Sequence, residues 1–279
     1  MDKNFCAAVI LYHPTARELN NVLEYAAIFS RVLAYDNTEG GISDAAKQKI
    51  AAAKEITLVA SGSNNGLSVA YNVLCKKAIA EGSYTHIVLY DQDSVPNKEN
   101  ITRLENYILS DSRTNIAVYG PRVIEPSIEK VMPLAKDEQD ADFLISSGSF
   151  IDLKIYQETD GFDENLFIDM IDYDYCYTVR AKGYRIIQYN KSIMHHAIGG
   201  YKQHGKRLVR QHSPLRKYYI IRNTLYFRRK QGIKKNELWY LIDRVRHTLR
   251  YDDNKLNKIK MMIKGYLDYR QNKMGKYGE

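Results

Sequence analysis

The sequence has few cysteines and no long apolar run. Its three cysteines, Cys6, Cys75 and Cys176, are widely spaced and odd in number, so neither a disulfide framework nor a paired CxxC metal motif is expected. No stretch approaches the roughly 18 apolar residues that a membrane-spanning helix needs. The opening residues, MDKNFCAAVILYHP, lack a small-residue cleavage site and indicate a buried strand instead of a signal peptide. We therefore expect a cytoplasmic protein.

Charge is distributed unevenly along the 279 residues. The formal net charge is +8, yet residues 1–200 contain 19 Lys and Arg against 27 Asp and Glu. Residues 201–279 contain 22 basic residues against 6 acidic ones, so the whole basic excess lies in this last part of the chain. A basic region of this kind is typical of proteins that bind nucleic acid or an anionic membrane surface.

The first half alternates short β-branched runs with longer helical patterns, which predicts βαβ units in a mostly parallel sheet. Apolar runs indicate strands, and amphipathic patterns that begin with capping residues indicate the helices between them. The strands are expected at residues 5–11, 31–35, 56–60, 86–90 and 116–119, and the helices at 16–28, 43–53, 67–80 and 98–109.

The second half begins with residues 120–142, whose three prolines and scattered charges indicate a loop or lid. An apolar block at 143–153 follows, then a helix at 171–182 and two short strands at 185–189 and 192–196. Beyond residue 200 the periodicity is helical throughout, with segments at 214–231, 234–249 and 254–271. We expect an α/β domain over residues 1–205 and a basic helical region over residues 206–279.

Two carboxylates follow the strand predicted at residues 86–90. Asp91 and Asp93 stand one residue apart where the strand ends, and open α/β sheets bind ligands at that edge. Paired acids suit a hard divalent cation such as Mg²⁺ or Mn²⁺, and such a cation neutralises the charge that builds on a diphosphate leaving group. The alternative is a surface turn with two solvated aspartates.

Polar residues also follow the second and third strands. Asp36 ends the second strand, where a nucleotide base or ribose would lie, or else it starts an Asp-Asn turn. Asn64 and Gly66 precede a helix whose N–H groups can face an anion or a polar ring. The alternative for this stretch is an ordinary capped turn.

Further acids and two histidines stand in the second half. One of Asp169, Asp172 and Asp174, at the start of a helix, can take the proton from an acceptor hydroxyl as a general base, although acids in a first helical turn are often dipole partners. His195 and His196 follow a predicted strand, and a neutral imidazole there can complete a mixed oxygen and nitrogen metal shell. A structural role for the histidines is the alternative.

Taken in order, these motifs resemble the family-2 glycosyltransferases and, within them, the bacterial rhamnosyltransferase-like branch that builds O-antigens, capsules and wall polysaccharides. The resemblance covers about residues 5–230. The motifs that carry it are Tyr12-His13-Pro14, Asp36-Asn37, Asn64-x-Gly66-Leu67-x-x-Ala70-x-Asn72, Asp91-Gln92-Asp93-Ser94, Ser147-Gly148-Ser149, Gly161-Phe162-Asp163-Glu164, Phe167-Ile168-Asp169, Asp172-x-Asp174-x-Cys176, Arg180-x-x-Gly183-Tyr184 and His196-x-x-Gly199.

The resemblance implies a GT-A fold with a donor site at the carboxyl edge of the sheet. In this family the residue at Tyr12 stacks on the nucleotide base, and the residue at Asp36 accepts from a ring N–H. Asn64, Asn72 and Asp91 belong to the same nucleotide-binding pattern. The implied metal ligands are Asp91, Asp93 and His196.

The resemblance also implies that Asp172 is the catalytic base of an inverting transfer. Many members have Glu where this chain has Ile171, and Thr is common where Leu11 stands. These departures leave open whether Asp169 or Asp174 shares the work of orienting the acceptor. The branch favours rhamnose from dTDP-rhamnose as the donor group, with a UDP-hexose or UDP-galactofuranose as the alternative, and a saccharide or lipid-linked saccharide as the acceptor.

The basic region suggests where the protein works. Residues 212–223 look like the segment that follows the catalytic domain in this branch, with Arg222 as a candidate acceptor contact. Basic residues interleaved with aromatic ones across residues 206–279 suit an anionic membrane surface or a lipid-linked pyrophosphate. We expect peripheral attachment at the inner face of the plasma membrane, and a solvated basic helical bundle is the alternative.

Three other classes compete with a glycosyltransferase. A nucleic-acid-binding protein is disfavoured because the clustered carboxylates of the first 200 residues would repel phosphates, so no nucleic-acid partner is expected. A nucleotidyltransferase should have a glycine-rich loop with a lysine after the first strand, and residues 12–15 contain neither. A non-catalytic module that binds a nucleotide sugar differs from an enzyme by the absence of turnover.

Overall fold

The computed structural model describes residues 4–125, 136–196, 200–204 and 207–278. The chain divides into two compact units, the first made of Met1–Glu164 with Asp172–Ala197 and the second of Asn165–Ile171 with Ile198–Glu279. The segment Asn165–Ile171 therefore groups with the C-terminal part of the chain, although it lies inside the range 1–205 expected for the α/β domain.

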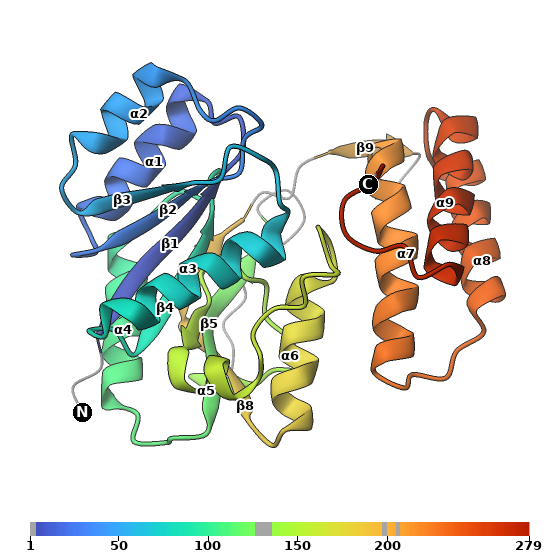
Figure 1. Ribbon diagram of the computed structural model, residues 1–279. Helices are drawn as coiled ribbons and strands as arrows, with labels where there is room; N and C mark the ends of the chain where they lie inside the picture. Colours follow the sequence, from blue (N-terminus) through green and yellow to red (C-terminus); the bar gives the residue numbers. More distant parts are fainter. Residues whose placement is uncertain (1–3, 126–135, 197–199, 205–206, 279) are drawn as a thin grey trace. The chain divides into compact units, whose positions relative to one another are not determined.

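The first unit is built on one eight-stranded, mostly parallel sheet (Figure 1). Strands β3, β2, β1 and β4 are parallel neighbours, β7 is antiparallel between β4 and β5, and β5 pairs in parallel with β8. In the order of the sheet, the strands are β3 (Ile56–Ala60), β2 (Val32–Asp36), β1 (Phe5–Leu11), β4 (His86–Asp91), β7 (Phe150–Asp152), β5 (Ile116–Ile124), β8 (Arg185–His195) and β6 (Glu138–Asp140).

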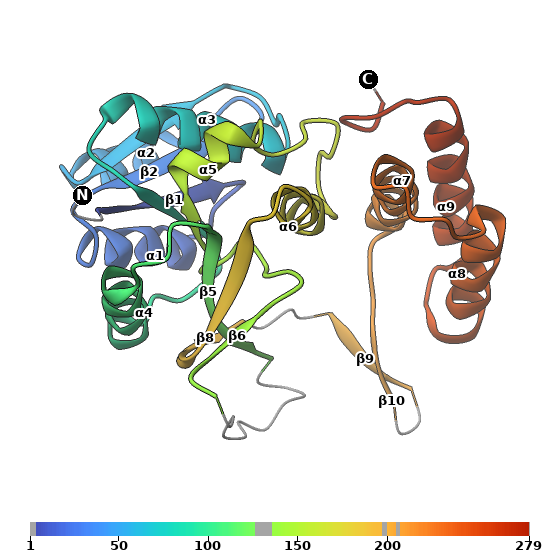
Figure 2. The same ribbon diagram turned by 90° about the horizontal axis from the view of Figure 1, so that it is seen from below.

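Helices cover both faces of this sheet. Figure 2 shows α1 and α4 on one face and α3 and α5 on the other. Alternate residues of β1 pack with α1, α2 and α4 in one apolar core, and their neighbours in the strand are equally buried, which explains why β1 is apolar throughout. The helices are α1 (Ala16–Ala26), α2 (Asp44–Ala51), α3 (Leu67–Glu81), α4 (Lys98–Ser110), α5 (Leu153–Glu158) and α6 (Ile171–Ala181).

The parallel register brings polar strand ends together. Leu11 pairs with Asp36, Asp36 pairs with Ala60, and Ile10 pairs with Asp91. The segments that leave β1, β2, β3 and β4 therefore start from the same edge of the sheet. The predicted α/β architecture is confirmed, and this edge carries the candidate site.

The second unit contains a β-hairpin and three helices. The hairpin pairs β9 (Tyr201–His204) with β10 (Arg207–Arg210), and the helices are α7 (Pro214–Lys230), α8 (Glu237–Tyr251) and α9 (Lys255–Arg270). Its core is formed by Ile221, Leu225, Leu241, Met262 and Tyr269. None of the helices in the described parts of the chain has both the length and the apolar character of a bilayer-crossing segment.

Three sequence-based expectations are corrected. The two strands expected at 185–189 and 192–196 are one strand, β8, with an irregularity where Tyr189 and Ile193 pair with the successive residues Pro121 and Arg122. The strand expected to end at Tyr119 continues to Ile124, so the first residues of the loop predicted at 120–142 belong to β5. Strand β6 lies in the last part of that predicted loop, and residues 126–135 lie outside the described residues. The β9–β10 hairpin stands where only helices were expected.

Candidate active site

The turn after β4 carries Asp91 and Asp93, and the residue between them ties it to β1. The Tyr12 N–H donates to Oε1 of Gln92 at 2.7 Å, and Nε2 of Gln92 donates to the Tyr12 carbonyl at 3.1 Å. The same amide group also donates to Glu18 of α1 at 3.1 Å. Gln92 is thereby held inward, while Asp91 is half-buried and Asp93 is exposed.

Two further elements fix the same turn. Asn21 and Tyr25 of α1 donate to the carbonyls of Gln92 and Ser94 at 3.0 and 3.1 Å. From the other side, Oγ of the buried Ser147 accepts the Asp91 N–H at 3.2 Å and lies 2.7 Å from Oγ of Ser94. The two carboxylates therefore stand on a backbone that hydrogen bonds within the protein hold from both sides.

The donor set of this turn fits a divalent cation. Mg²⁺ is commonly held by one or two carboxylates together with phosphate oxygens and water, and Asp91 and Asp93 can supply that number. No group of three or more His, Cys, Asp or Glu side chains able to hold a metal occurs within the described residues. The structure accordingly does not gather His196, whose N–H donates to the Ile124 carbonyl at 3.0 Å, into such a cluster with the two aspartates.

Asp36 organises the turn that follows β2. Its Oδ1 accepts the Thr38 N–H at 3.0 Å, and its Oδ2 accepts the Ile42 N–H at 2.7 Å. The residue is 0% exposed, so a nucleotide base can reach the carboxylate only if this turn opens. Tyr12, in contrast, is 44% exposed at the end of β1, where its ring can meet a planar base.

The two asparagines of the Asn-rich motif have different environments. Asn64 is half-buried, and its Oδ1 accepts the N–H of Gly66, the N-cap residue of α3, at 3.1 Å. Asn72 is buried: its Nδ2 donates to the Phe162 carbonyl and to Glu164, and its Oδ1 accepts from Tyr156 and from the Phe162 N–H. Two donations and two acceptances use the full capacity of an amide, so a nucleotide contact by Asn72 would have to replace one of these bonds.

Asp172 stands in the first turn of α6, half-buried, and lines a small cavity with Ser146 and Leu89. The Tyr71 hydroxyl of α3 donates to Oγ of Ser146 at 3.0 Å. Burial raises the pKa of the Tyr71 phenol well above its usual value, and the negative charges of Asp91 and Asp172 raise it further. Asp91 and Asp172, far apart in the sequence, therefore lie within electrostatic reach of one hydroxyl.

The other two acids of the Asp169–Asp174 stretch differ in exposure. Asp174 is buried, and its predicted part in orienting the acceptor stays a prediction. Asp169 belongs to the second unit, where Nε and Nη2 of Arg216 both donate to its Oδ1, at 3.3 and 3.0 Å. Its Oδ2 is buried and has no hydrogen-bond partner among the described residues.

Arg222 is an interior residue of the second unit. Its Nη2 donates to the Gly275 carbonyl at 2.6 Å, its Nε donates to Oδ1 of Asn223 at 3.0 Å, and its guanidinium lies about 5 Å from the rings of Tyr218 and Tyr219. The side chain is fully buried. The predicted contact of Arg222 with an acceptor would therefore require these bonds to open.

Comparison with known proteins identifies a relative. No protein-family model matches the chain. It is 26% identical over 254 residues to the dTDP-rhamnosyl transferase RfbF of Shigella flexneri, in an alignment that covers 84% of this chain and 82% of RfbF. The chain is a glycosyltransferase related to RfbF.

Solved structures show the same fold. The crystal structure of S. aureus TarS residues 1–349 matches with a TM-score of 0.51 and 13% identity, covering 96% of this chain and 72% of that one. GalNAc-T7, crystallised with UDP, GalNAc and Mn²⁺, matches with a TM-score of 0.58 and 11% identity over 96% of this chain and 56% of its own. The GT-A fold predicted from the sequence is confirmed.

The glycosyltransferase has an exposed aromatic pair beside Asp172 that the sequence did not reveal. The rings of Phe143 and Tyr173 stack with centroids 4.1 Å apart and planes 28° apart, and both residues are exposed. Partial burial and the charge of Asp172 both raise the pKa of Tyr173. Tyr173 adjoins the base motif, but only the fold brings Phe143 to it.

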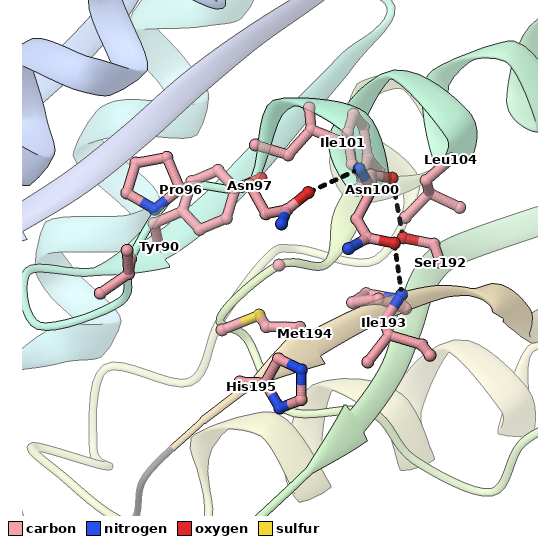
Figure 3. A pocket seen from close by; sticks show the side chains of 14 residues that line it. Tyr90, Pro96, Asn97, Asn100, Ile101, Leu104, Ser192, Ile193, Met194 and His195 are labelled. Carbon is pink, nitrogen blue, oxygen red and sulfur yellow. Dashed lines mark hydrogen bonds between the residues drawn. The ribbon is translucent and has the colours of Figure 1, made fainter. Parts of the chain in front are cut away.

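A larger cavity lies under the α4 face of the glycosyltransferase (Figure 3). It has a volume of about 220 Å³, and Tyr90 of β4 lines it, whereas the preceding residue Leu89 lines the cavity of Asp172. Successive strand residues point to opposite faces, so the two cavities are on opposite sides of the sheet. Asn97 and Asn100 reach the larger one from the start of α4, opposite residues at the end of β8.

Proposed function

We propose that this protein is an inverting rhamnosyltransferase that moves rhamnose from dTDP-rhamnose to a saccharide or lipid-linked saccharide acceptor in the synthesis of a cell-surface polysaccharide. The observation that carries the proposal is that Asp172 lines a cavity with Ser146 while the next residue, Ser147, accepts the Asp91 N–H, together with the likeness to RfbF. The transfer that we propose uses one group of carboxylates to bind a cation at the diphosphate and a separate carboxylate to take the proton of the acceptor hydroxyl. Both are present in the first unit.

The donor is held at the carboxyl edge of the sheet. The exposed ring of Tyr12 stacks on the base, the turns at Asp36 and Asn64 border the nucleoside, and Asp91 and Asp93 face the diphosphate. These two carboxylates would hold Mg²⁺ or Mn²⁺, which when bound offsets the negative charge of the departing nucleotide diphosphate. His196 would be a third ligand of that cation.

Asp172 acts as the general base. It accepts the proton of an acceptor hydroxyl while that oxygen forms a bond to the anomeric carbon, and the bond from that carbon to the diphosphate oxygen breaks on the opposite face. The proton ends on Asp172, the nucleotide diphosphate leaves with the bonding electrons, and the anomeric configuration is inverted. Phe143 and Tyr173 offer an apolar surface to the acceptor sugar ring beside this base. Asp169 stays a predicted acceptor contact.

The second unit supplies attachment to an anionic membrane surface. Leu256, Ile263 and Leu267 are exposed, Leu256 by 84%, and their spacing puts them on one face of α9. Lys260 follows the same spacing, and α8 adds exposed Leu238 and Trp239. Apolar side chains among basic ones favour the headgroup region of an anionic leaflet, which here is the cytoplasmic face of the plasma membrane.

A UDP-hexose or UDP-galactofuranose is the second candidate donor. Thymine and uracil present the same ring N–H, so the residues that face the base do not distinguish them. The observation that favours a uridine nucleotide is that GalNAc-T7 and one of the matching TarS structures were determined with UDP.

A screen of nucleotide sugars tests the proposal. Calorimetry with dTDP-rhamnose, UDP-glucose and UDP-galactofuranose, each with and without Mn²⁺, should give saturable Mn²⁺-dependent binding for dTDP-rhamnose. Release of dTDP should then depend on an added saccharide acceptor, and NMR of the product should show the inverted anomer. Binding without acceptor-dependent turnover would instead indicate a non-catalytic module, and retention of configuration would refute the role of Asp172.

A further inference from the structure

The segment Asn165–Ile171, which leads directly into α6, is held by α7. The buried Asn223 donates through Nδ2 to the Ile168 carbonyl at 2.6 Å and more weakly to the Asp169 carbonyl at 3.4 Å. Since both acceptors are backbone atoms, this contact fixes the path of the chain and does not depend on the side chains of the segment.

An ion pair holds the next residues. Arg216, in the first turn of α7, donates twice to Oδ1 of Asp169. Asp169 and Met170 both have left-handed backbone conformations, with φ of 62° and 68°. Such conformations are unfavourable for residues other than glycine and persist where the surroundings enforce them. Ile171, the first residue of α6, follows at once.

The beginning of the segment is anchored as well. The Phe167 ring stacks on Tyr219 with centroids 5.4 Å apart, and Nδ2 of Asn165 donates to the Tyr226 hydroxyl at 3.1 Å. The Gly275 N–H donates to the Asn165 carbonyl at 3.1 Å, and the Gly275 carbonyl is itself held by Arg222. All these partners belong to the second unit.

We propose that Asn223 and Arg216 are positioning residues for Asp172: by fixing the strained segment before α6, they set where the first turn of that helix begins. The proposal rests on the proposed function, in which Asp172 is the general base. Neither residue touches the reacting atoms. The C-terminal helices thus contribute to the chemical step through the chain that they hold.

The physical reason is the short reach of a general base. Asp172 has to come within about 2.6–3.2 Å of the acceptor hydroxyl, and a misplacement of about 1 Å can cost roughly 10²-fold in rate. Asp172 is two residues beyond Met170, so release of the left-handed pair shifts its backbone directly. Donor binding uses residues of β1, β2 and β4 and should be indifferent to that shift.

Matched variants of the full chain separate this role from general stability. Asn223→Asp keeps the oxygen that Arg222 uses but loses the donation to Ile168, and Arg216→Ala removes the ion pair with Asp169. Tyr269→Phe is the control, because it removes a buried hydroxyl of the second unit, bound to Glu237, that has no hydrogen bond to Asn165–Ile171 or to Arg222.

The measurements are kcat with a soluble saccharide acceptor, donor Kd by calorimetry, Tm, and amide hydrogen exchange in residues 172–176. We expect kcat to fall roughly 10- to 100-fold in Asn223→Asp and Arg216→Ala with donor Kd unchanged within about twofold, and exchange in residues 172–176 to accelerate. Arg216→Lys should recover part of kcat. Tyr269→Phe should lower Tm and keep kcat within about twofold.

Two outcomes overturn the inference. If Asn223→Asp and Arg216→Ala keep the kcat of the control, or if all three variants lose kcat in proportion to Tm, the two residues are only structural. Asp172→Asn, measured alongside, distinguishes this failure from a failure of the proposed function. If Asp172→Asn retains full turnover, Asp172 is not the base and the proposed function fails. If Asp172→Asn loses turnover while Asn223→Asp keeps the wild-type kcat, only the positioning role is refuted.

Discussion

Gln92 holds both backbone hydrogen-bonding groups of Tyr12, as acceptor at 2.7 Å and as donor at 3.1 Å. The residue between the two acids of the β4 turn is thus the one that joins this turn to the end of β1. One side-chain amide therefore links the backbone of Tyr12 to the turn that carries the two carboxylates. In the donor site that we propose, Gln92 is therefore the residue whose replacement tests how the two turns are held together.

Replacement of Gln92 by Leu should weaken donor binding about tenfold, which is the expected result of losing two hydrogen bonds that organise the site. Calorimetry with the nucleotide diphosphate measures this. Gln92→Glu, which keeps the acceptor for the Tyr12 N–H, should have a smaller effect. Wild-type affinity in Gln92→Leu would show that the Tyr12 backbone needs no such support.

Asp172→Asn should keep donor affinity and lose turnover by about 10²- to 10⁴-fold, the usual contribution of a general base. The amide has nearly the same shape but cannot accept the proton. Steady-state kinetics and calorimetry on the same preparation separate the two effects. Turnover at the wild-type rate would show that another residue is the general base.

Asp93→Ala should abolish the Mn²⁺ dependence of nucleotide binding, because Asp93 is the more exposed of the two carboxylates that face the diphosphate. Titrations with and without Mn²⁺ are compared for the variant and for Glu99→Ala, which removes an exposed acid of α4. The role of Asp93 in binding the cation would be refuted by equal metal dependence in wild type and Asp93→Ala.

Stability should depend on pH through Glu105 of α4. Burial raises its pKa from 4.5 to about 7. The folded protein then binds more protons than the unfolded chain between these values, so this residue's contribution to the free energy of unfolding falls as pH rises from about 5 to 8. Glu105 is partly exposed, and screening by solvent limits the effect to about 1 kcal/mol, or about 2–4 °C in Tm.

Glu105→Gln removes this titration. Its Tm should exceed that of the wild type at pH 8 and approach it at pH 5, as thermal unfolding followed by circular dichroism would show. Parallel Tm curves for the two proteins across this range would mean that the carboxyl group titrates normally.

Leu256→Ser combined with Ile263→Ser should weaken binding to vesicles of phosphatidylglycerol about tenfold, because both side chains are exposed on one face of α9 and support little of the core. Cosedimentation measures binding, and zwitterionic vesicles serve as the control surface. Removal of all residues after 232 is a poorer test, since α8 and α9 contribute Leu241 and Met262 to the core that covers Leu225. If the double variant cosediments with the anionic vesicles as well as the wild type does, this face of α9 is not the membrane-binding surface.

The sequence predicted strands β1 to β4 closely because each is a short apolar run followed by a turn signal. The bounds of β1 and β3 agree with the prediction at both ends. It missed the continuity of β8 because Asn190, Lys191 and Ser192 look like a turn, whereas the structure accommodates them as an irregularity against β5. It missed β9 and β10 because their charged residues show no alternation that separates a strand from a helix.

The candidate site could be predicted only as far as residue type and strand position allow. Asp91 and Asp93 were found because they follow a buried strand directly. The internal roles of Asn72 and Arg222 were not visible, because their partners are 84 to 92 and up to 53 residues away in the sequence. The exposed stack of Phe143 on Tyr173 was not predicted either, because the two residues are also distant in the sequence.

The grouping of Asn165–Ile171 with the C-terminal helices has a consequence for protein engineering. A hybrid enzyme that joins the first 205 residues of this chain to the helices of a relative would pair the native segment with foreign partners in place of Asn223 and Arg216. Such hybrids should fold and still take up the donor, yet turn over slowly. Transplanting residues 165–171 together with the helices should restore the turnover of the hybrid enzymes.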